Sequence, residues 1–218
     1  MMLLLAPHHD DVLLSLPARL LAARRQGESS GLQVAIVFSE EDEALERLCD
    51  RLHAGLGVRV SKLRLLEARR RGERLREILY TRRDMTTIHS DPLVAIIAER
   101  VAAVANVTRS RDLITPFIAA HRDHALVRAA AERLSHSAGY PLFYYADQPY
   151  ALLWPDHAPD ADTRLELLPE GDEPTVAISL QEVEQLLTPL APCIGPRTLQ
   201  RILTRYRQSL RAEPLWGR

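Results

Sequence analysis

The chain has 218 residues, of which 46% are hydrophobic and 26% charged, an ordinary composition for a globular protein that buries one sizeable core. Its 28 basic and 29 acidic residues give a formal net charge of −1, which argues against a nucleic-acid or membrane-surface protein. The two cysteines, Cys49 and Cys193, form no CxxC pair, so we expect no disulfide framework.

The first residues, MMLLLAPHHDD, have no basic region before a very short apolar stretch. This pattern is typical of a first strand and not of a signal peptide. No run in the chain approaches the ~18 apolar residues of a membrane span. We therefore expect a cytoplasmic protein without a membrane span.

The N-terminal part of the chain follows a strand–helix–strand pattern. Residues 2–6 are a continuous apolar run that predicts a fully buried strand, and 17–26 (PARLLAARRQ) predict a helix opened by Pro17. Residues 33–38 (QVAIVF) predict a second buried strand. This succession is a βαβ unit, which implies a parallel sheet with a right-handed crossover.

The remaining elements continue the alternation. We expect helices at 41–55, 62–79, 92–104 and 123–136, and strands at 112–117 and 141–145. Further on, 163–168 and 175–180 flank PEGDEP and predict an antiparallel hairpin. Ser179 to Glu182 resembles a capping box, and 197–211 predict a last helix.

The predicted fold class is α/β: a Rossmann-like, mostly parallel sheet with helices on both faces and a small C-terminal α+β appendage. Residues 1–158 form the core, and residues 159–218 form a hairpin and helices packed on it. We expect one structural domain overall.

Ligand-type side chains follow two of the predicted strands. The first group, in APHHDD, comes directly after strand 2–6; the second, in HRDH at 121–124, comes a short loop after strand 112–117. Ligands of open parallel sheets bind beyond the carboxyl ends of the strands. The two groups can therefore converge if their strands are neighbours in the sheet.

A cluster of this kind is costly to bury unless a cation neutralises it. Imidazole and carboxylate ligands suit zinc or another divalent first-row metal such as Fe²⁺. A catalytic zinc site uses three protein ligands, and the remaining groups can serve in proton transfer or stabilise an oxyanion. The candidates are His8, His9, Asp10, Asp11, His121 and His124.

Each motif alone is a weak signal, because a histidine-rich turn is more often a solvated loop. The two together, each behind a strand, indicate a metal site. The other histidines have no such neighbours, and we expect them at the surface: His53, His89, His136 and His157.

With both motifs in place, the chain resembles the PIG-L/LmbE-like de-N-acetylases. That family has a P-H-x-D-D or H-P-D-D stretch after its first strand and H-x-D-H after a later one, matched here by Pro7 to Asp11 and by His121 to His124. The stretch 143–150 (FYYADQPY) resembles the Y-x-D-x-P-Y segment of one branch, and 213–216 (EPLW) resembles that branch's ending.

The resemblance implies a role for each matched position. His8, Asp11 and His124 would bind the metal, and Asp10 would be the general base. His121 would stabilise the oxyanion or act as the acid, while Asp123 would hold His121 in the required tautomer. Three further matches imply substrate contacts: Arg70 (from an R-x-x-E pattern), Asp147 and Tyr150.

Two departures from the family pattern bear on the site. His9 stands where the family has Pro or Leu and offers an extra ligand. The segment between Glu73 and the helix near 92–104 is shortened, which bears on the substrate.

The resemblance implies a zinc-dependent, or other divalent-metal-dependent, hydrolase. It would remove an N-acetyl group from an N-acetylglucosamine-type amino sugar or sugar conjugate and release acetate and a free amine. The alternative is a catalytically idle relative that binds metal or sugar, although binding alone requires neither Asp10 nor His121. A metallophosphoesterase would need more bridging carboxylates than the sequence supplies.

Overall fold

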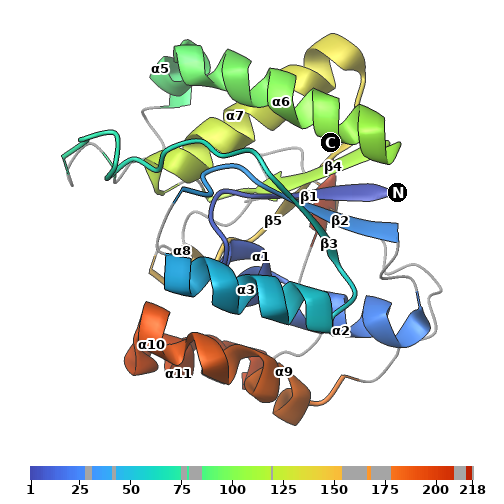
Figure 1. Cartoon of the computed structure of the whole chain (residues 1–218), viewed down its shortest axis with the longest axis vertical. Coiled ribbons are helices and arrows are strands. Elements are labelled where there is room, and N and C mark those ends of the chain that lie inside the picture. The colour runs from blue at the N-terminus through green and yellow to red at the C-terminus, as the bar shows by residue number, and fades with distance from the viewer. Residues whose placement is uncertain are drawn as a thin grey trace.

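The apolar runs of the sequence become the strands of one sheet (Figure 1). The computed structural model describes residues 1–27, 31–40, 43–74, 78, 85–118, 120–153, 166–167, 178–208 and 215–217. Among these residues the sheet has seven strands in the order β3-β2-β1-β4-β5-β7-β6. Their bounds are β1 Met2–Ala6, β2 Leu32–Ile36, β3 Arg59–Lys62, β4 Asp112–Pro116, β5 Leu142–Tyr145, β6 Glu166–Leu167 and β7 Leu215–Gly217.

The five strands from β1 to β5 are parallel, and the two short ones at the far edge run antiparallel. β1 lies between β2 and β4, so the chain changes its direction of winding between β1 and β4. Such a switch point is where open α/β sheets bind their ligands. The α/β fold with a mostly parallel sheet is therefore confirmed.

Helices cover both faces of the sheet (Figure 1). The helices are α1 Asp11–Ser15, α2 Pro17–Gln26, α3 Glu43–Gly55, α5 Met85–His89, α6 Pro92–Thr108, α7 Arg122–Ala138, α8 Tyr150–Leu153, α9 Leu180–Leu187, the 3₁₀ turn η4 Thr188–Leu190, α10 Ala191–Ile194 and α11 Pro196–Gln208. None of the helices in the described segments is long and apolar enough to cross a membrane.

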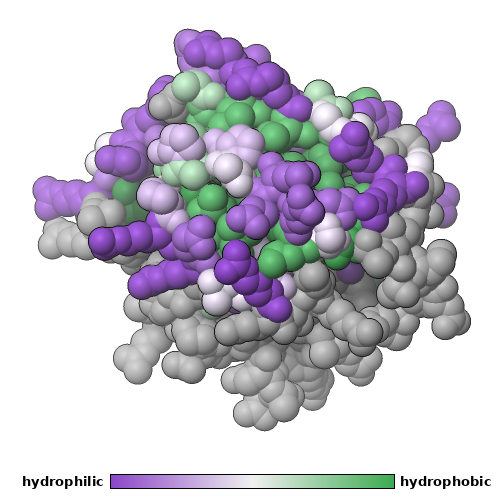
Figure 2. Space-filling model, turned by 90° about the horizontal axis from the view of Figure 1, so that it is seen from below, coloured by the Kyte–Doolittle hydropathy of each residue, from purple (hydrophilic) through white to green (hydrophobic). Residues whose placement is uncertain are grey.

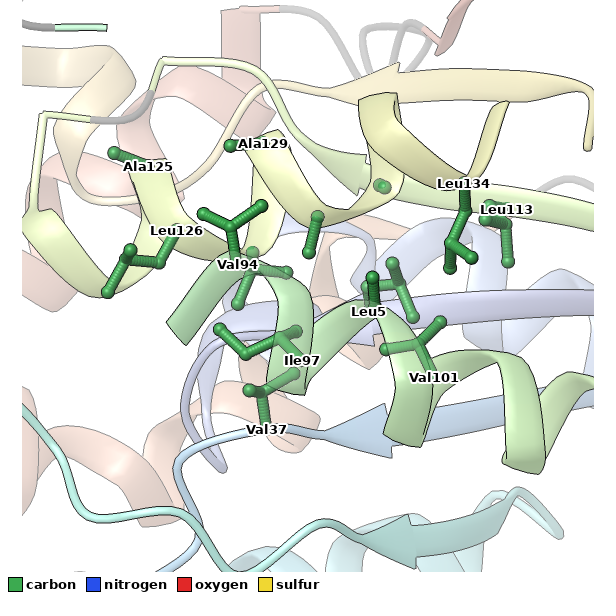
Figure 3. Close-up of a cluster of buried hydrophobic side chains, with 14 of the residues drawn as sticks. Leu5, Val37, Val94, Ile97, Val101, Leu113, Ala125, Leu126, Ala129 and Leu134 are labelled. Carbon is green, nitrogen blue, oxygen red and sulfur yellow. The ribbon is translucent and has the colours of Figure 1, made fainter. Parts of the chain in front are cut away.

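The alternation of side chains in β1 divides the core in two. Leu3 and Leu5 join a cluster with α6 and α7 on one face, shown in Figure 3. Leu4 and Ala6 join a second cluster with α1, α2 and α3 on the other. Because both faces are covered, β1 has apolar residues at every position rather than at alternate ones.

The C-terminal helices extend the second cluster. Val183 of α9 and Ile202 of α11 are fully buried in it, and α9 packs against α2. The predicted capping box is confirmed, since Ser179 accepts from the backbone of Glu182 and the Glu182 side chain accepts in return. Seen from the side of these helices, hydrophobic surface shows between hydrophilic side chains (Figure 2).

Three sequence-based expectations were wrong or fall partly outside the described residues. The helix expected at 62–79 is instead the end of β3 followed by turns at 68–72, so the arginine-rich tract is not a helix face. β6 pairs with β7; of its expected partner 175–180, only 178–180 are described, and these residues lead into α9. His53 is buried, with 1% of its surface exposed; His89 and His136 are exposed as expected, and His157 lies outside the described residues.

Candidate metal centre

The pairing of β1 with β4 brings the two ligand motifs together. The strands run parallel with Met2 opposite Asp112 and Leu4 opposite Ile114, so their carboxyl ends share one edge. There the first motif turns into α1, with Asp10 as its N-cap, and the second turns into α7, with His121 as its N-cap. The sequence predicted that the two motifs converge if their strands are neighbours. β1 and β4 are neighbours, and the motifs do converge.

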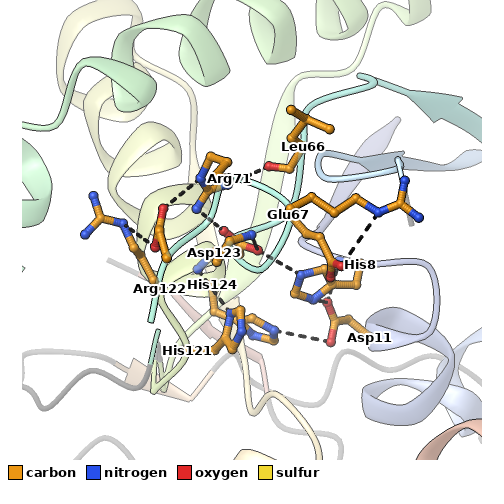
Figure 4. A network of polar contacts seen from close by, with 12 residues as sticks. His8, Asp11, Leu66, Glu67, Arg71, His121, Arg122, Asp123 and His124 are labelled. Atoms are coloured by element: carbon orange, nitrogen blue, oxygen red, sulfur yellow. Dashed lines mark hydrogen bonds and ion pairs between the residues drawn. The ribbon is translucent and has the colours of Figure 1, made fainter. Parts of the chain in front are cut away.

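Three of the expected ligands form a cluster that could hold a metal ion. His8, Asp11 and His124 each offer one ligand atom, all within 4.8 Å of one another. Nδ1 of His8 is 3.4 Å from one Asp11 oxygen, and Nε2 of His124 is 3.4 Å from the other. Figure 4 shows these side chains pointing toward one another from the two motifs.

Each of the two imidazoles is held by its own buried carboxylate. Nε2 of His8 is 3.1 Å from Oδ2 of Asp123, and Nδ1 of His124 is 2.8 Å from Oδ2 of Asp147. Metal-ligating histidines usually donate their second N–H to such a partner, which fixes the tautomer and the ring orientation.

The second nitrogen of His124 shows that these residues fit a metal. Nε2 of His124 is buried and has no hydrogen-bond partner among the described residues. An orphaned buried nitrogen is costly unless something binds it. With two imidazoles and a carboxylate facing one point, the donor set suits zinc or a similar divalent ion.

A second group of possible ligands, His8, His121 and Asp123, overlaps the first. Asp123 is already engaged in it: its Oδ1 accepts from Arg71 at 2.7 Å, and its Oδ2 also accepts from the backbone N–H of Ala68 at 3.0 Å. Because these donors and His8 occupy both oxygens, the group with Asp11 and His124 is the better metal site.

Charges in the cluster are mutually stabilised. Burial alone would raise the pKa of Asp11, but the charge of His124 and the hydrogen bonds with His8 lower it below its ordinary value. Burial would likewise lower the pKa of His124, yet Asp11 and Asp147 raise it. The cluster therefore keeps Asp11 ionised.

Asp10 stands apart from this cluster. It is partly exposed, and its side chain makes no capping hydrogen bond at the start of α1. Burial and the neighbouring Asp11 raise the pKa of Asp10 to about 6. A carboxylate with a pKa near the working pH is suited to accept and return a proton.

His121 lies beside His8 and His124 and has one ring nitrogen engaged. Its Nδ1 accepts from the backbone N–H of Asp123 at 3.2 Å, so in the neutral ring Nε2 carries the proton. Burial and the charges of His124 and His8 lower the pKa of His121 to about 3. Its ring centroid lies 5.3 Å from that of His8 and 6.1 Å from that of Tyr150.

The contacts of Asp123 and Asp147 can be compared with the roles expected for them. The Asp123 carboxylate hydrogen-bonds with His8 and Arg71, and its backbone N–H donates to His121. Asp147, expected to contact substrate, is fully buried and accepts from Ile118 and His124.

Among the expected substrate residues, Arg70 is nearly half exposed, and its Nε lies 4.0 Å from Oε1 of Glu67. The neighbouring Arg71, which we did not single out from the sequence, is the arginine that reaches Asp123. Tyr150 does line the site, with its ring centroid 4.9 Å from that of His124.

His9 turns away from the cluster. It is fully buried, and its Nε2 lies 3.3 Å from the carbonyl oxygen of Ser39. It belongs to neither group of possible ligands. The extra ligand that this substitution offered is therefore not part of the cluster.

Solved structures of similar fold include several deacetylases. No family model matches the sequence, and a search of curated proteins gives no match. A deacetylase of the teicoplanin biosynthesis pathway, in complex with teicoplanin, has a TM-score of 0.72 at 18% identity, covering 99% of this chain and 96% of that one. The zinc-inhibited form of teicoplanin deacetylase Orf2 has a TM-score of 0.67 at 19% identity, covering 99% and 97%.

Two further structures widen the comparison. The A40926 pseudoaglycone deacetylase Dbv21 has a TM-score of 0.68 at 22% identity, covering 99% of this chain and 95% of that one. The 4-carboxy-2-hydroxymuconate hydratase GalB from Pseudomonas putida has a TM-score of 0.54 at 13% identity, covering 99% and 93%. Because the fold also occurs in a hydratase, the reaction has to be argued from the site. By its structure, this chain has the α/β fold of the PIG-L/LmbE deacetylases.

Proposed function

We propose that the chain is a metal-dependent hydrolase that removes an N-acetyl group from an amino sugar or sugar conjugate, releasing acetate and a free amine. One observation carries the proposal: two imidazoles, each held by its own buried carboxylate, face Asp11 at the switch point of the sheet. The likeness in fold to a deacetylase of teicoplanin biosynthesis and to the A40926 pseudoaglycone deacetylase supports it.

His8, Asp11 and His124 would hold the ion. A divalent metal with an open position polarises a carbonyl group and lowers the pKa of water. Zinc is one candidate, since one structural neighbour is a deacetylase in a zinc-inhibited form. Iron or another first-row ion suits the same donors.

Asp10 would act as the general base. It would take a proton from the water that attacks the acetyl carbonyl and later return it to the nitrogen as the C–N bond breaks. Its partial exposure, its lack of a capping bond and its raised pKa support this role.

His121 would stabilise the negative charge that develops on the carbonyl oxygen. With Nδ1 engaged by the Asp123 backbone, the neutral ring carries its N–H donor at Nε2. The low pKa of His121 favours this neutral donor over a charged general acid.

The alternative is a relative that binds metal or sugar without turnover. An acetate-release assay separates the two: zinc-loaded protein is incubated with N-acetylglucosamine and a series of its alkyl and aryl glycosides, with Asp10→Asn as the matched control. The proposal expects acetate and free amine in equal amounts from at least one compound. A wild type that binds zinc but releases no acetate from the whole series would favour the binding module.

A further inference from the structure

Arg71 makes several contacts at the site, although the sequence motifs did not single it out. Its Nη2 donates to Oδ1 of Asp123 at 2.7 Å, its Nε to Glu73 at 2.8 Å, and its Nη1 to the carbonyl of Leu66 at 2.6 Å. The guanidinium also lies 5.0 Å from the centre of the Phe38 ring. Three hydrogen bonds and a ring therefore fix its position (Figure 4).

The partner that matters most is Asp123, which has no exposed surface. A buried carboxylate needs a charged partner and hydrogen bonds to stay ionised. Its Oδ1 accepts from Arg71 and its Oδ2 accepts from the backbone N–H of Ala68, so both oxygens already act as acceptors. Asp123 is therefore an acceptor, and the His8 nitrogen that faces it carries the proton.

This arrangement decides which nitrogen of His8 is left for a metal. With the proton on Nε2, Nδ1 keeps its lone pair and lies toward Asp11. If Asp123 lost its charge or moved, the neutral ring of His8 could take the other tautomer, which has no lone pair on the metal side.

We propose that Arg71 is a positioning residue of the reaction, which acts through Asp123 to fix the tautomer and orientation of His8. The proposal rests on the proposed metal site, although its effect on His8 can be measured without metal. Arg71 touches neither a metal ligand nor the reacting atoms in this role.

The chain of charges beyond Arg71 supports positioning rather than substrate contact. Glu73 is shared with Arg122, whose Nε lies 3.2 Å from its second oxygen, and Arg122 in turn binds Asp91, the N-cap of α6. Glu73 and Arg122 therefore link Arg71 to the N-terminal ends of α6 and α7. The adjacent Arg69 is exposed and offers a matched control.

The test compares Arg71→Met, Arg71→Lys and Arg69→Met in the full-length protein. Methionine keeps contact with Phe38 but removes the charge, and lysine keeps the charge but not the planar three-bond fork. Two quantities are measured: the tautomer of His8 by ¹⁵N NMR of the metal-free protein, and the zinc dissociation constant by competition with a chelator.

We expect wild type and Arg69→Met to hold His8 with its proton on Nε2 and to bind zinc equally well. Arg71→Met should populate both tautomers and bind zinc ~10–100-fold more weakly, the usual cost of losing an outer partner of a metal ligand. Arg71→Lys should lie between them.

An unchanged tautomer and an unchanged zinc affinity in a folded Arg71→Met would overturn the proposal. Should that variant fail to fold, as judged by circular dichroism, Arg71→Lys decides, and values equal to wild type would overturn it. If wild type itself binds no zinc, the proposed metal site is wrong. The role of Arg71 is then decided by the His8 tautomer alone, compared between wild type and the Arg71 variants.

Discussion

The Asp147 carboxylate lies 2.8 Å from Nδ1 of His124, and this contact turns the other nitrogen of His124 toward Asp11. The second oxygen of Asp147 accepts from the backbone of Ile118 at 2.7 Å, so the carboxylate itself is fixed. It joins the end of β5 to the start of α7. Asp147 therefore orients a proposed metal ligand from a strand that carries neither motif.

Asp147→Asn should weaken metal binding. Asparagine has one oxygen for two donors and no charge to favour the His124 tautomer, so we expect ~10–100-fold lower zinc affinity. Chelator competition measures it, with Asp112→Asn at the opposite end of β4 as control. Equal zinc affinity in Asp147→Asn and wild type would contradict the orienting role.

Asp10→Asn and Asp11→Asn should differ in their effects on turnover and on metal binding. Asp10→Asn removes the proposed base and should keep its metal while losing ~10²–10⁴ in turnover. Asp11→Asn removes a proposed ligand and should lose metal affinity first. Metal content and kcat, measured on both variants, check this, and exchanged phenotypes would show that the base and the ligand are assigned the wrong way round.

His121→Ala should keep its fold and its metal. The lost donor acts on charge that develops in the transition state, so we expect kcat to fall ~10²–10³ with KM little changed. Steady-state kinetics and elemental analysis on the same sample measure both quantities. Loss of metal together with activity would make His121 a ligand instead.

The main features of the sheet and of the motifs could be predicted from the sequence, because both depend on short-range pattern. The run 2–6 and the run 112–117 are apolar enough to be buried strands, and ligand-type residues follow the first directly and the second after a short loop. What the sequence left open was whether these strands are neighbours, since strand order is set by long-range pairing.

The errors have physical causes. The arginine-rich tract at 69–74 has helical periodicity. However, Arg71 and Glu73 form ion pairs with groups far away in the sequence, and residues 68–72 form turns instead of a helix. Asp147 was found from a resemblance as a substrate contact, and its hydrogen bond with His124 was not predicted. Its position just after β5, next to β4, was the available signal for an orienting role.

The stability of the fold should depend on pH through His53. This histidine is buried in α3, its ring nitrogens lack partners of good geometry among the described residues, and burial lowers its pKa to about 4. The unfolded chain, with a histidine pKa near the ordinary value of about 6.5, binds the proton more readily. Stability is therefore fully present above that value and is lost as pH falls toward 4.

Between pH 7 and pH 5 this one group should cost about 2 kcal/mol of unfolding free energy. Urea unfolding of wild type and His53→Gln at both pH values measures it, with His136→Gln as an exposed control. The loss of unfolding free energy between pH 7 and pH 5 should be smaller in His53→Gln than in wild type, and it should be unchanged in His136→Gln. Equal slopes in all three proteins would exclude His53 as the cause.

Metal content tests most directly whether the two motifs form one metal centre. The wild type, reconstituted with zinc or ferrous iron and freed of excess, should retain about one ion per chain by elemental analysis, as three-ligand sites do. Asp11→Asn and His124→Ala should each retain much less under the same washing. Two results would contradict the shared site: a wild type that retains no ion after reconstitution, or variants that both retain as much metal as the wild type.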